Sequence, residues 1–232
     1  MNRLSPSVIR AIFENAKAII PKDHFVYKSG KHGPAYVNKD AIYPDTNNVA
    51  RLCGEIAVRT HDLAVDVVVA PAIGGVILSQ WTAQQLYTIY NRPVFKVEPD
   101  FFDVKHVFSV YAEKDPANED VMVIKRGYNK FLPGKNVLVV EDILNTGGSA
   151  AKTVQAVRDC SGKVVAVAAL CNRGGVTAED LGGDLKLFSL MDVQMDMYEA
   201  DECPLCKEGV PINAELGHGR EFLAALEKQN KT

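Results

Sequence analysis

The sequence lacks the features of a membrane or secreted protein. Its apolar runs are too short to cross a bilayer. The five cysteines are an odd number with only Cys203 and Cys206 close together, unlike the paired pattern of a disulfide scaffold. The N-terminal stretch carries Glu14 in its middle and has no apolar core before a small-residue cleavage site, so we expect no signal peptide. These absences predict a cytoplasmic protein with reduced thiols.

An excess of positive charge is also missing. The chain has 26 Lys and Arg against 29 Asp and Glu, a net charge of −3, whereas a surface for long nucleic acid normally carries a basic excess. We therefore expect neither nucleic acid nor a membrane as partner. The GxxxxGK[ST] and GxGxxG patterns are absent too, which disfavours ATP and dinucleotide sites. Any phosphate must be bound by another local arrangement.

The sequence does contain apolar segments bounded by glycine and proline. Three nearly continuous runs cover residues 65–72, 136–142 and 163–171, and the first two are each followed by a helical pattern. Buried parallel strands in crossover units have this appearance. Strand-like segments on both sides of the polar residues 115–120 predict a hairpin that projects from the sheet and could serve as a lid. The pattern predicts an α/β fold with a parallel sheet.

The segments outside the sheet suggest how the chain is organised. Ser5 and Pro6 begin an N-terminal helix, residues 24–38 are typical of two short strands around a turn, and Asp45 caps a helix that runs to about Arg59. We expect one domain covering residues 1–232, composed of an N-terminal hood region (1–62), a core (63–200) and a C-terminal extension (201–232).

The strongest chemical signal is VLVVEDILNTGGSAAKTVQAV, residues 137–157. An apolar strand ends in Glu141 and Asp142, which could accept hydrogen bonds from the vicinal hydroxyls of a ribose. A turn of small residues then leads into a helix beginning near Ala150. Backbone N–H groups, two hydroxyls and a helix N-terminus converge there, as a phosphate monoester requires. The residues of this turn are Asn145, Thr146, Gly147, Gly148 and Ser149.

This string resembles the phosphoribosyl pyrophosphate signature of type I phosphoribosyltransferases, in which apolar residues, two acids and a T-G-G/T-S-like loop occur in the same order. The resemblance implies a Rossmann-like parallel-sheet core with a small N-terminal hood and a projecting β-hairpin loop. It assigns the 5-phosphate to the turn after Asp142. It also implies a pyrophosphate loop after an earlier strand. VVVAPAIGGVILSQ supplies this loop at Ala72, Ile73, Gly74 and Gly75.

Within that superfamily the chain is most similar to orotate phosphoribosyltransferases. FVYKSGKHGPAYVNKD, residues 25–40, matches a pattern in which Lys28 reaches the active site and the stretch around Tyr36 covers the base. CNRGG, residues 171–175, places Arg173 where those enzymes bind the carboxylate of the base. A fixed guanidinium suits a planar carboxylate because it donates two parallel hydrogen bonds.

The sequence departs from the better-known orotate enzymes at two places. Gly74 stands where their pyrophosphate loop carries a lysine, and the projecting hairpin is poorer in lysine than their mobile loop. We take Lys114 and Arg126 as the candidate catalytic cations, together with Asp142. The resemblance implies Mg²⁺ held mainly by substrate oxygens and water rather than by a protein cage. It also implies a homodimer with shared active sites.

Several interpretations of the function and of the CPLC segment stay open. Arg173 with Lys28 favours an acidic base such as orotate, but a transferase for a purine or another pyrimidine has the same signature. A non-catalytic regulator that senses phosphoribosyl pyrophosphate is a further alternative. The CPLC segment at Cys203 to Cys206 could be half a zinc site or a redox pair. Because one CxxC supplies only two metal ligands, a structural turn is favoured there.

Overall fold

The computed structural model describes residues 3–91 and 104–229, which form two compact units. Among those residues, the first unit contains the chain up to Arg10 and from Asp45 to Val193, and the second contains Ala11–Pro44 and the chain from Gln194 onward. Helix α1 (Pro6–Asn15) includes the first boundary. Residues 45–62, expected in the hood, belong to the unit that holds the large sheet.

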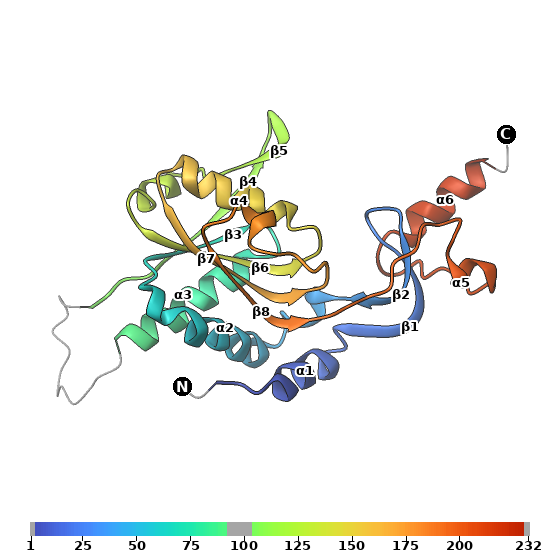
Figure 1. The fold of residues 1–232 in the computed structure, drawn as a ribbon, viewed down its shortest axis with the longest axis horizontal. Helices are drawn as coiled ribbons and strands as arrows, with labels where there is room; N and C mark the ends of the chain where they lie inside the picture. Colours follow the sequence, from blue (N-terminus) through green and yellow to red (C-terminus); the bar gives the residue numbers. More distant parts are fainter. Residues whose placement is uncertain (1–2, 92–103, 230–232) are drawn as a thin grey trace. The chain divides into compact units, whose positions relative to one another are not determined.

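The first unit is built on a six-stranded sheet, which confirms the predicted α/β fold (Figure 1). Its order is β5-β4-β3-β6-β7-β8, with β5 antiparallel to β4 and the other strands parallel. The strands are β3 (Val67–Pro71), β4 (Phe108–Asp115), β5 (Asn118–Val123), β6 (Asn136–Leu144), β7 (Lys163–Asn172) and β8 (Lys186–Asp192).

The order of the parallel strands identifies the edge at which a ligand should bind. When the five parallel strands are numbered by their order along the chain, their order across the sheet is 2-1-3-4-5. The direction of winding therefore reverses between β3 and β6. Open α/β sheets bind their ligands outside the carboxyl ends of the strands at this switch point. Both loops that the sequence assigns to phosphate groups follow these two strands.

Helices cover both faces of the sheet. Helices α2 (Thr46–Thr60) and α3 (Val76–Tyr90) lie on one face and α4 (Gly148–Asp159) on the other (Figure 1). Asp45 caps α2 as expected, accepting hydrogen bonds from the backbone N–H groups of Asn47 and Asn48 at 3.0 and 3.2 Å. Short 3₁₀ helices are η2 (His61–Leu63), η3 (Tyr128–Phe131) and η4 (Glu179–Leu181).

The core explains why the central strands are nearly continuous apolar runs. Val137 and Val139 of β6 pack in one cluster with Val154 and Val157 of α4. The alternate residue Leu138 is also fully buried, and it points to the opposite face because side chains alternate along a strand. No helix in residues 3–91 and 104–229 is long and apolar enough to span a bilayer.

The predicted hairpin is present as β4 and β5, and it is tighter than expected. Asp115 pairs with Asn118, so the turn consists of Pro116 and Ala117 and the strands continue into the polar segment. The hairpin projects beyond the sheet (Figure 1). An ion pair between Lys152 Nζ and an Asp120 carboxylate oxygen, 3.1 Å, links it to α4.

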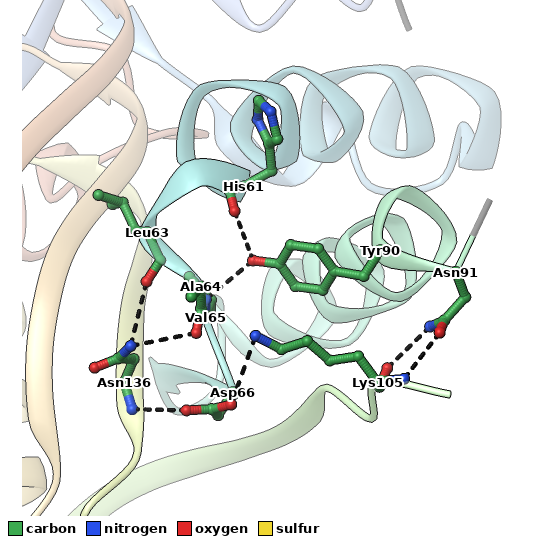
Figure 2. A network of polar contacts seen from close by, with 9 residues as sticks. All are labelled: His61, Leu63, Ala64, Val65, Asp66, Tyr90, Asn91, Lys105 and Asn136. Atoms are coloured by element: carbon green, nitrogen blue, oxygen red, sulfur yellow. Dashed lines mark hydrogen bonds and ion pairs between the residues drawn. The ribbon is translucent and has the colours of Figure 1, made fainter. Parts of the chain in front are cut away.

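A polar network holds the amino ends of β3 and β6 (Figure 2). The phosphate loops follow the carboxyl ends of the same strands. The Asn136 N–H donates to Asp66 at 3.0 Å, and the Tyr90 hydroxyl accepts from the Val65 N–H at 2.9 Å and donates to the His61 carbonyl at 3.1 Å. Burial raises the pKa of Tyr90, which keeps this donor protonated. The network fixes two central strands without occupying the ligand edge.

The second unit joins an early hairpin to the C-terminal segment. Strands β1 (Ile19–Val26) and β2 (His32–Val37) pair antiparallel. Backbone hydrogen bonds attach the late segment to this hairpin: His32 and Tyr198 exchange two at 2.8 and 2.9 Å, and the Asn213 N–H donates to the His24 carbonyl at 2.8 Å. The unit also contains η1 (Lys39–Ala41), α5 (Pro204–Lys207) and α6 (Gly219–Gln229).

Candidate active site

The two phosphate loops leave neighbouring strands at one edge of the sheet. Strands β3 and β6 pair in parallel, with Val67 opposite Val137 and Val69 opposite Val139. The loop at residues 72–75 follows β3, and the loop at residues 145–149 follows β6. Because the strands are parallel neighbours, both loops and the helices after them begin at the same edge. Two phosphate groups of one ligand can thus be bound there.

The loop after β6 surrounds a small pocket. Its volume is about 70 Å³, and its lining includes Glu141 and Asn145 to Ala150. This is far below the ~300–1,000 Å³ of pockets for drug-sized ligands, so it suits one phosphate group rather than a whole nucleotide. The Gly148 N–H donates to the Thr146 hydroxyl at 3.4 Å, which holds the turn. Helix α4 begins at Gly148, two residues before the expected start.

Gly147 is required by the backbone of this loop. Its φ is 76°, a left-handed value that side chains other than glycine rarely adopt. A β-carbon there would lie 3.0 Å from a methyl carbon of Val176 and 3.2 Å from one of Leu181. The loop therefore rests directly on a buried apolar surface formed by Val176 and Leu181.

The two acids at the end of β6 are both buried and held by backbone amides. Glu141 is 6 % exposed and Asp142 is 4 % exposed. Glu141 accepts from the Asp142 N–H at 3.0 Å, and Asp142 accepts from the Ile143 N–H at 2.7 Å. Only Glu141 belongs to the lining of the phosphate pocket. Each carboxylate is thus oriented by a backbone N–H group before a ligand binds.

The turn after β7 lies against the loop after β6. The N–H groups of Arg173 and Gly174 both donate to the Leu144 carbonyl, at 2.9 and 3.2 Å. A β-carbon on Gly174 would overlap the carbonyl oxygen of Asn145. Asn172 closes the turn by exchanging two side-chain hydrogen bonds with the backbone of Val176. The backbone of Arg173 is consequently anchored to Leu144, a residue of the pocket lining, and its side chain is half-buried.

Two backbone N–H groups of the loop after β3 already form hydrogen bonds within the protein. The Ala72 N–H donates to the Ala112 carbonyl at 2.7 Å, and the Gly75 N–H donates to the Pro71 carbonyl at 3.2 Å. The peptide bond between Ala72 and Ile73 is cis, and the Ile73 side chain is 88 % exposed. Of the four residues predicted to bind pyrophosphate, Ala72 and Gly75 thus have N–H groups that already bond within the protein.

Comparison with known proteins agrees with this arrangement. The phosphoribosyl transferase domain family matches residues 41–202. The orotate phosphoribosyltransferase of Caldicellulosiruptor bescii is 34 % identical over 201 residues, which cover 87 % of this chain and 92 % of that one. The chain belongs to the orotate phosphoribosyltransferase family.

Solved phosphoribosyltransferases share the fold. The Mycobacterium tuberculosis orotate phosphoribosyltransferase in complex with inorganic phosphate superposes with a TM-score of 0.58 at 21 % identity, covering 81 % of this chain and 96 % of that one. An adenine phosphoribosyltransferase from Thermoanaerobacter pseudethanolicus gives 0.58 at 16 % identity, with 82 % and 100 % covered. The fold is thus common to enzymes named for different bases, and the base must be read from individual residues.

Of the two candidate cations, Lys114 lies in β4 of the hairpin and Arg126 follows β5, and neither belongs to the lining of the phosphate pocket. Lys114 pairs with Glu119, and Arg126 pairs with Glu113, each at 3.3 Å. The hydrogen bond to Glu113 raises the pKa of Arg126. Both cations are exposed, and exposed ion pairs contribute little to stability. Either cation can therefore exchange its carboxylate for a phosphate.

The candidates for the base divide between the two units. Lys28 is exposed in the turn between β1 and β2, and Tyr36 lies in β2 with its ring 5.3 Å from that of Phe25. Both belong to the second unit, whereas the other candidate residues belong to the first. The sequence did not point to Leu144, whose carbonyl anchors Arg173. Every residue type has a backbone carbonyl, so an acceptor of this kind cannot be recognised from the sequence.

Proposed function

We propose that the protein transfers the 5-phosphoribosyl group from phosphoribosyl pyrophosphate to orotate, forming orotidine 5′-phosphate and pyrophosphate in pyrimidine nucleotide biosynthesis. The proposal rests chiefly on the anchoring of the Arg173 turn against the phosphate loop through the Leu144 carbonyl. That backbone contact supports a role for Arg173 as a carboxylate-binding cation next to a site for a phosphorylated ribose. The odd number of cysteines, with only Cys203 and Cys206 closely spaced, supports the cytoplasm as the location of the protein.

The geometry supports a direct displacement at C1 of the ribose. A base nitrogen attacks C1 as the bond to pyrophosphate breaks, through a transition state with oxocarbenium character. Glu141 and Asp142 hold the ribose hydroxyls, and their negative charge favours the positive charge that develops on the sugar. The loop after β6 binds the 5-phosphate through its N–H groups. The amides of Ile73 and Gly74 bind the leaving pyrophosphate.

Arg173 and Lys28 select an acidic base. The carboxylate of orotate accepts two parallel hydrogen bonds from the guanidinium of Arg173. The resemblance to the orotate enzymes assigns Lys28 as a second positive charge for the base and Tyr36 as the residue that covers its plane. A neutral purine offers no partner for either cation. Specificity of this kind is strong because a site built for a charged group leaves its own charges unpaired with the wrong ligand.

The acids suit Mg²⁺ that is bound mainly through the substrate. Glu141 and Asp142 are oxygen ligands of the kind this cation prefers, but each already accepts a backbone hydrogen bond. Substrate oxygens and water would supply most of the cation's ligands. Bound there, Mg²⁺ would neutralise negative charge on the pyrophosphate.

The choice of base is tested with the native protein and a panel of bases. With phosphoribosyl pyrophosphate and Mg²⁺ present, we expect the ultraviolet absorbance of orotate to fall, and uracil, adenine and guanine to remain. Omitting phosphoribosyl pyrophosphate provides the blank. Turnover of another base in place of orotate would overturn the assignment. Binding of phosphoribosyl pyrophosphate without turnover of any base would indicate a sensor.

We further propose a homodimer in which the hairpin cations act on the partner's site. Arg126→Ala and Asp142→Asn are each expected to be inactive. Mixed after mild dissociation, they should recover about a quarter of native activity, since half of the randomly formed dimers contain one intact site. Two variants of the same hairpin, Lys114→Ala and Arg126→Ala, serve as the control and should recover none. Failure of the first mixture to recover activity would exclude action in trans.

A further inference from the structure

Four side chains suited to metal binding meet in the second unit. They come from two segments far apart in sequence: His24 and His32 from the β1–β2 hairpin, and Cys203 and Cys206 from the CPLC segment. One ligand atom of each lies within 4.8 Å of the others. His24, His32 and Cys203 are fully buried, and Cys206 is exposed. The CxxC pair thus has the two additional ligands that the sequence alone did not reveal.

The distances between these atoms are close to those around a tetrahedral ion. With bonds of ~2.3 Å to sulfur and ~2.0–2.1 Å to nitrogen, neighbouring ligands of Zn²⁺ lie ~3.6 Å apart for N and S and ~3.3 Å for N and N. In the protein, His24 Nε2 is 3.6 Å from both cysteine sulfurs, and His32 Nδ1 is 3.3 Å from the sulfur of Cys206. The two ring nitrogens are 2.9 Å apart. Small increases in the N–N distance and in the distance from His32 Nδ1 to the sulfur of Cys206 would accommodate the ion.

The surroundings fix His24 in the form that binds a metal. Its Nδ1 lies 2.8 Å from the Val210 carbonyl, which accepts only from a protonated nitrogen. The lone pair is therefore on Nε2, the atom that faces the two sulfurs and His32. Metal-bound histidines are commonly oriented by a carbonyl in this way. The ring of His32 is held edge-on to Phe222, with centroids 4.8 Å apart.

Hydrogen bonding among the four groups does not account for their arrangement. The single lone pair on His24 Nε2 faces His32 Nδ1 and both thiols, and it can accept one proton well. Thiols are weak donors, so most of the contacts at this centre are poor hydrogen bonds. Buried polar groups that converge without adequate partners reduce stability. A cation at the common centre satisfies all four.

We propose that His24, His32, Cys203 and Cys206 bind one Zn²⁺ as a structural site. Two sulfur and two nitrogen ligands in a tetrahedral arrangement are typical of zinc. Both cysteines bind as thiolates, and their two protons pass to solvent. All four positions are filled by protein, so no position remains for a substrate. The ion fastens the CPLC segment to the β1–β2 hairpin, joining the two parts of the second unit.

The site is tested first by metal content. Protein purified without chelator is expected to contain about one zinc per chain by plasma mass spectrometry. Cys206→Ser replaces an exposed ligand by a side chain of similar size and should abolish zinc retention. Cys160→Ser, in the first unit, is the matched control and should keep the metal. Protein that neither contains zinc nor takes it up at micromolar concentration would overturn the proposal, as would retention by Cys206→Ser.

Substitution by Co²⁺ tests the ligand set independently of folding and of activity. The native protein is expected to show thiolate-to-cobalt charge transfer and the intense visible bands of a tetrahedral centre. Cys206→His keeps four ligands, so it should still bind cobalt with weaker charge transfer because one sulfur is lost. Removal of the metal from native protein should expose residues 194–232 to limited proteolysis. Octahedral spectra, or unchanged charge transfer in Cys206→His, would contradict the assigned ligands.

Discussion

Replacing Arg173 by alanine is expected to lower kcat/KM for orotate about a hundredfold or more. Each hydrogen bond to a charged group is worth about 1.5–3 kcal/mol, and two are lost together, while tenfold corresponds to about 1.4 kcal/mol. The KM for phosphoribosyl pyrophosphate should change little, because the 5-phosphate loop and the two acids remain. Initial rates measured against both substrates separate these effects.

The position of Arg173 makes this experiment selective. Its N–H is bound to the Leu144 carbonyl, so truncating the side chain leaves the backbone anchor in place. Arg173→Lys keeps the charge but not the paired donors, and we expect it to recover only part of the activity. Arg158→Ala is a matched control, since Arg158 binds the Gly182 and Gly183 carbonyls at the far end of α4. An Arg173→Ala enzyme with unchanged orotate kinetics would contradict the role given to this residue.

Gly174→Ala is expected to damage both stability and turnover. The new β-carbon would overlap the Asn145 carbonyl oxygen, a backbone atom that can move only with the phosphate loop. Overpacking of this kind costs about 1–3 kcal/mol. A loop displacement of about 1 Å can lower the rate about a hundredfold. Urea unfolding and orotate consumption measure the two effects on the same preparation.

Gly175→Ala is the control for this substitution. Gly175 has a φ of 64°, but a β-carbon there would meet no atom within 4 Å. It should therefore lose about 1 kcal/mol from backbone strain alone, with turnover close to native. Equal losses of turnover in the two variants would show that strain in the turn, not contact with Asn145, controls the loop.

The sequence predicts the sheet well because its strands are buried on both faces. Apolar runs bounded by glycine mark β3, β6 and β7 within a few residues, and Asp45 marks the start of α2. Strand β8 escaped prediction because it is an edge strand with mixed burial. The sequence also did not predict that the β1–β2 hairpin forms one unit with the C-terminal segment. Pairings such as His32 with Tyr198 join residues whose separation along the chain carries no local signal.

The candidate site shows the same division between local and long-range information. The signature loop could be located because its glycines and acids are consecutive in sequence. Which amides remain for pyrophosphate could not be predicted, since Ala72 uses its N–H on Ala112 of another strand. Likewise Cys203 and Cys206 are recognisable as a pair, but the histidines that complete the cluster lie in a distant hairpin.

The interleaving of the two units has a consequence for synthesis on the ribosome. The first unit is almost continuous in sequence and is complete once Val193 has been made. The two parts of the second unit come from opposite ends of the chain. The β1–β2 hairpin is therefore synthesised before the entire six-stranded sheet, and the C-terminal segment that pairs with it is synthesised last. Nascent chains that stall after Val193 should thus contain a completed first unit and a hairpin that lacks its C-terminal partner, a form that protein quality control can recognise.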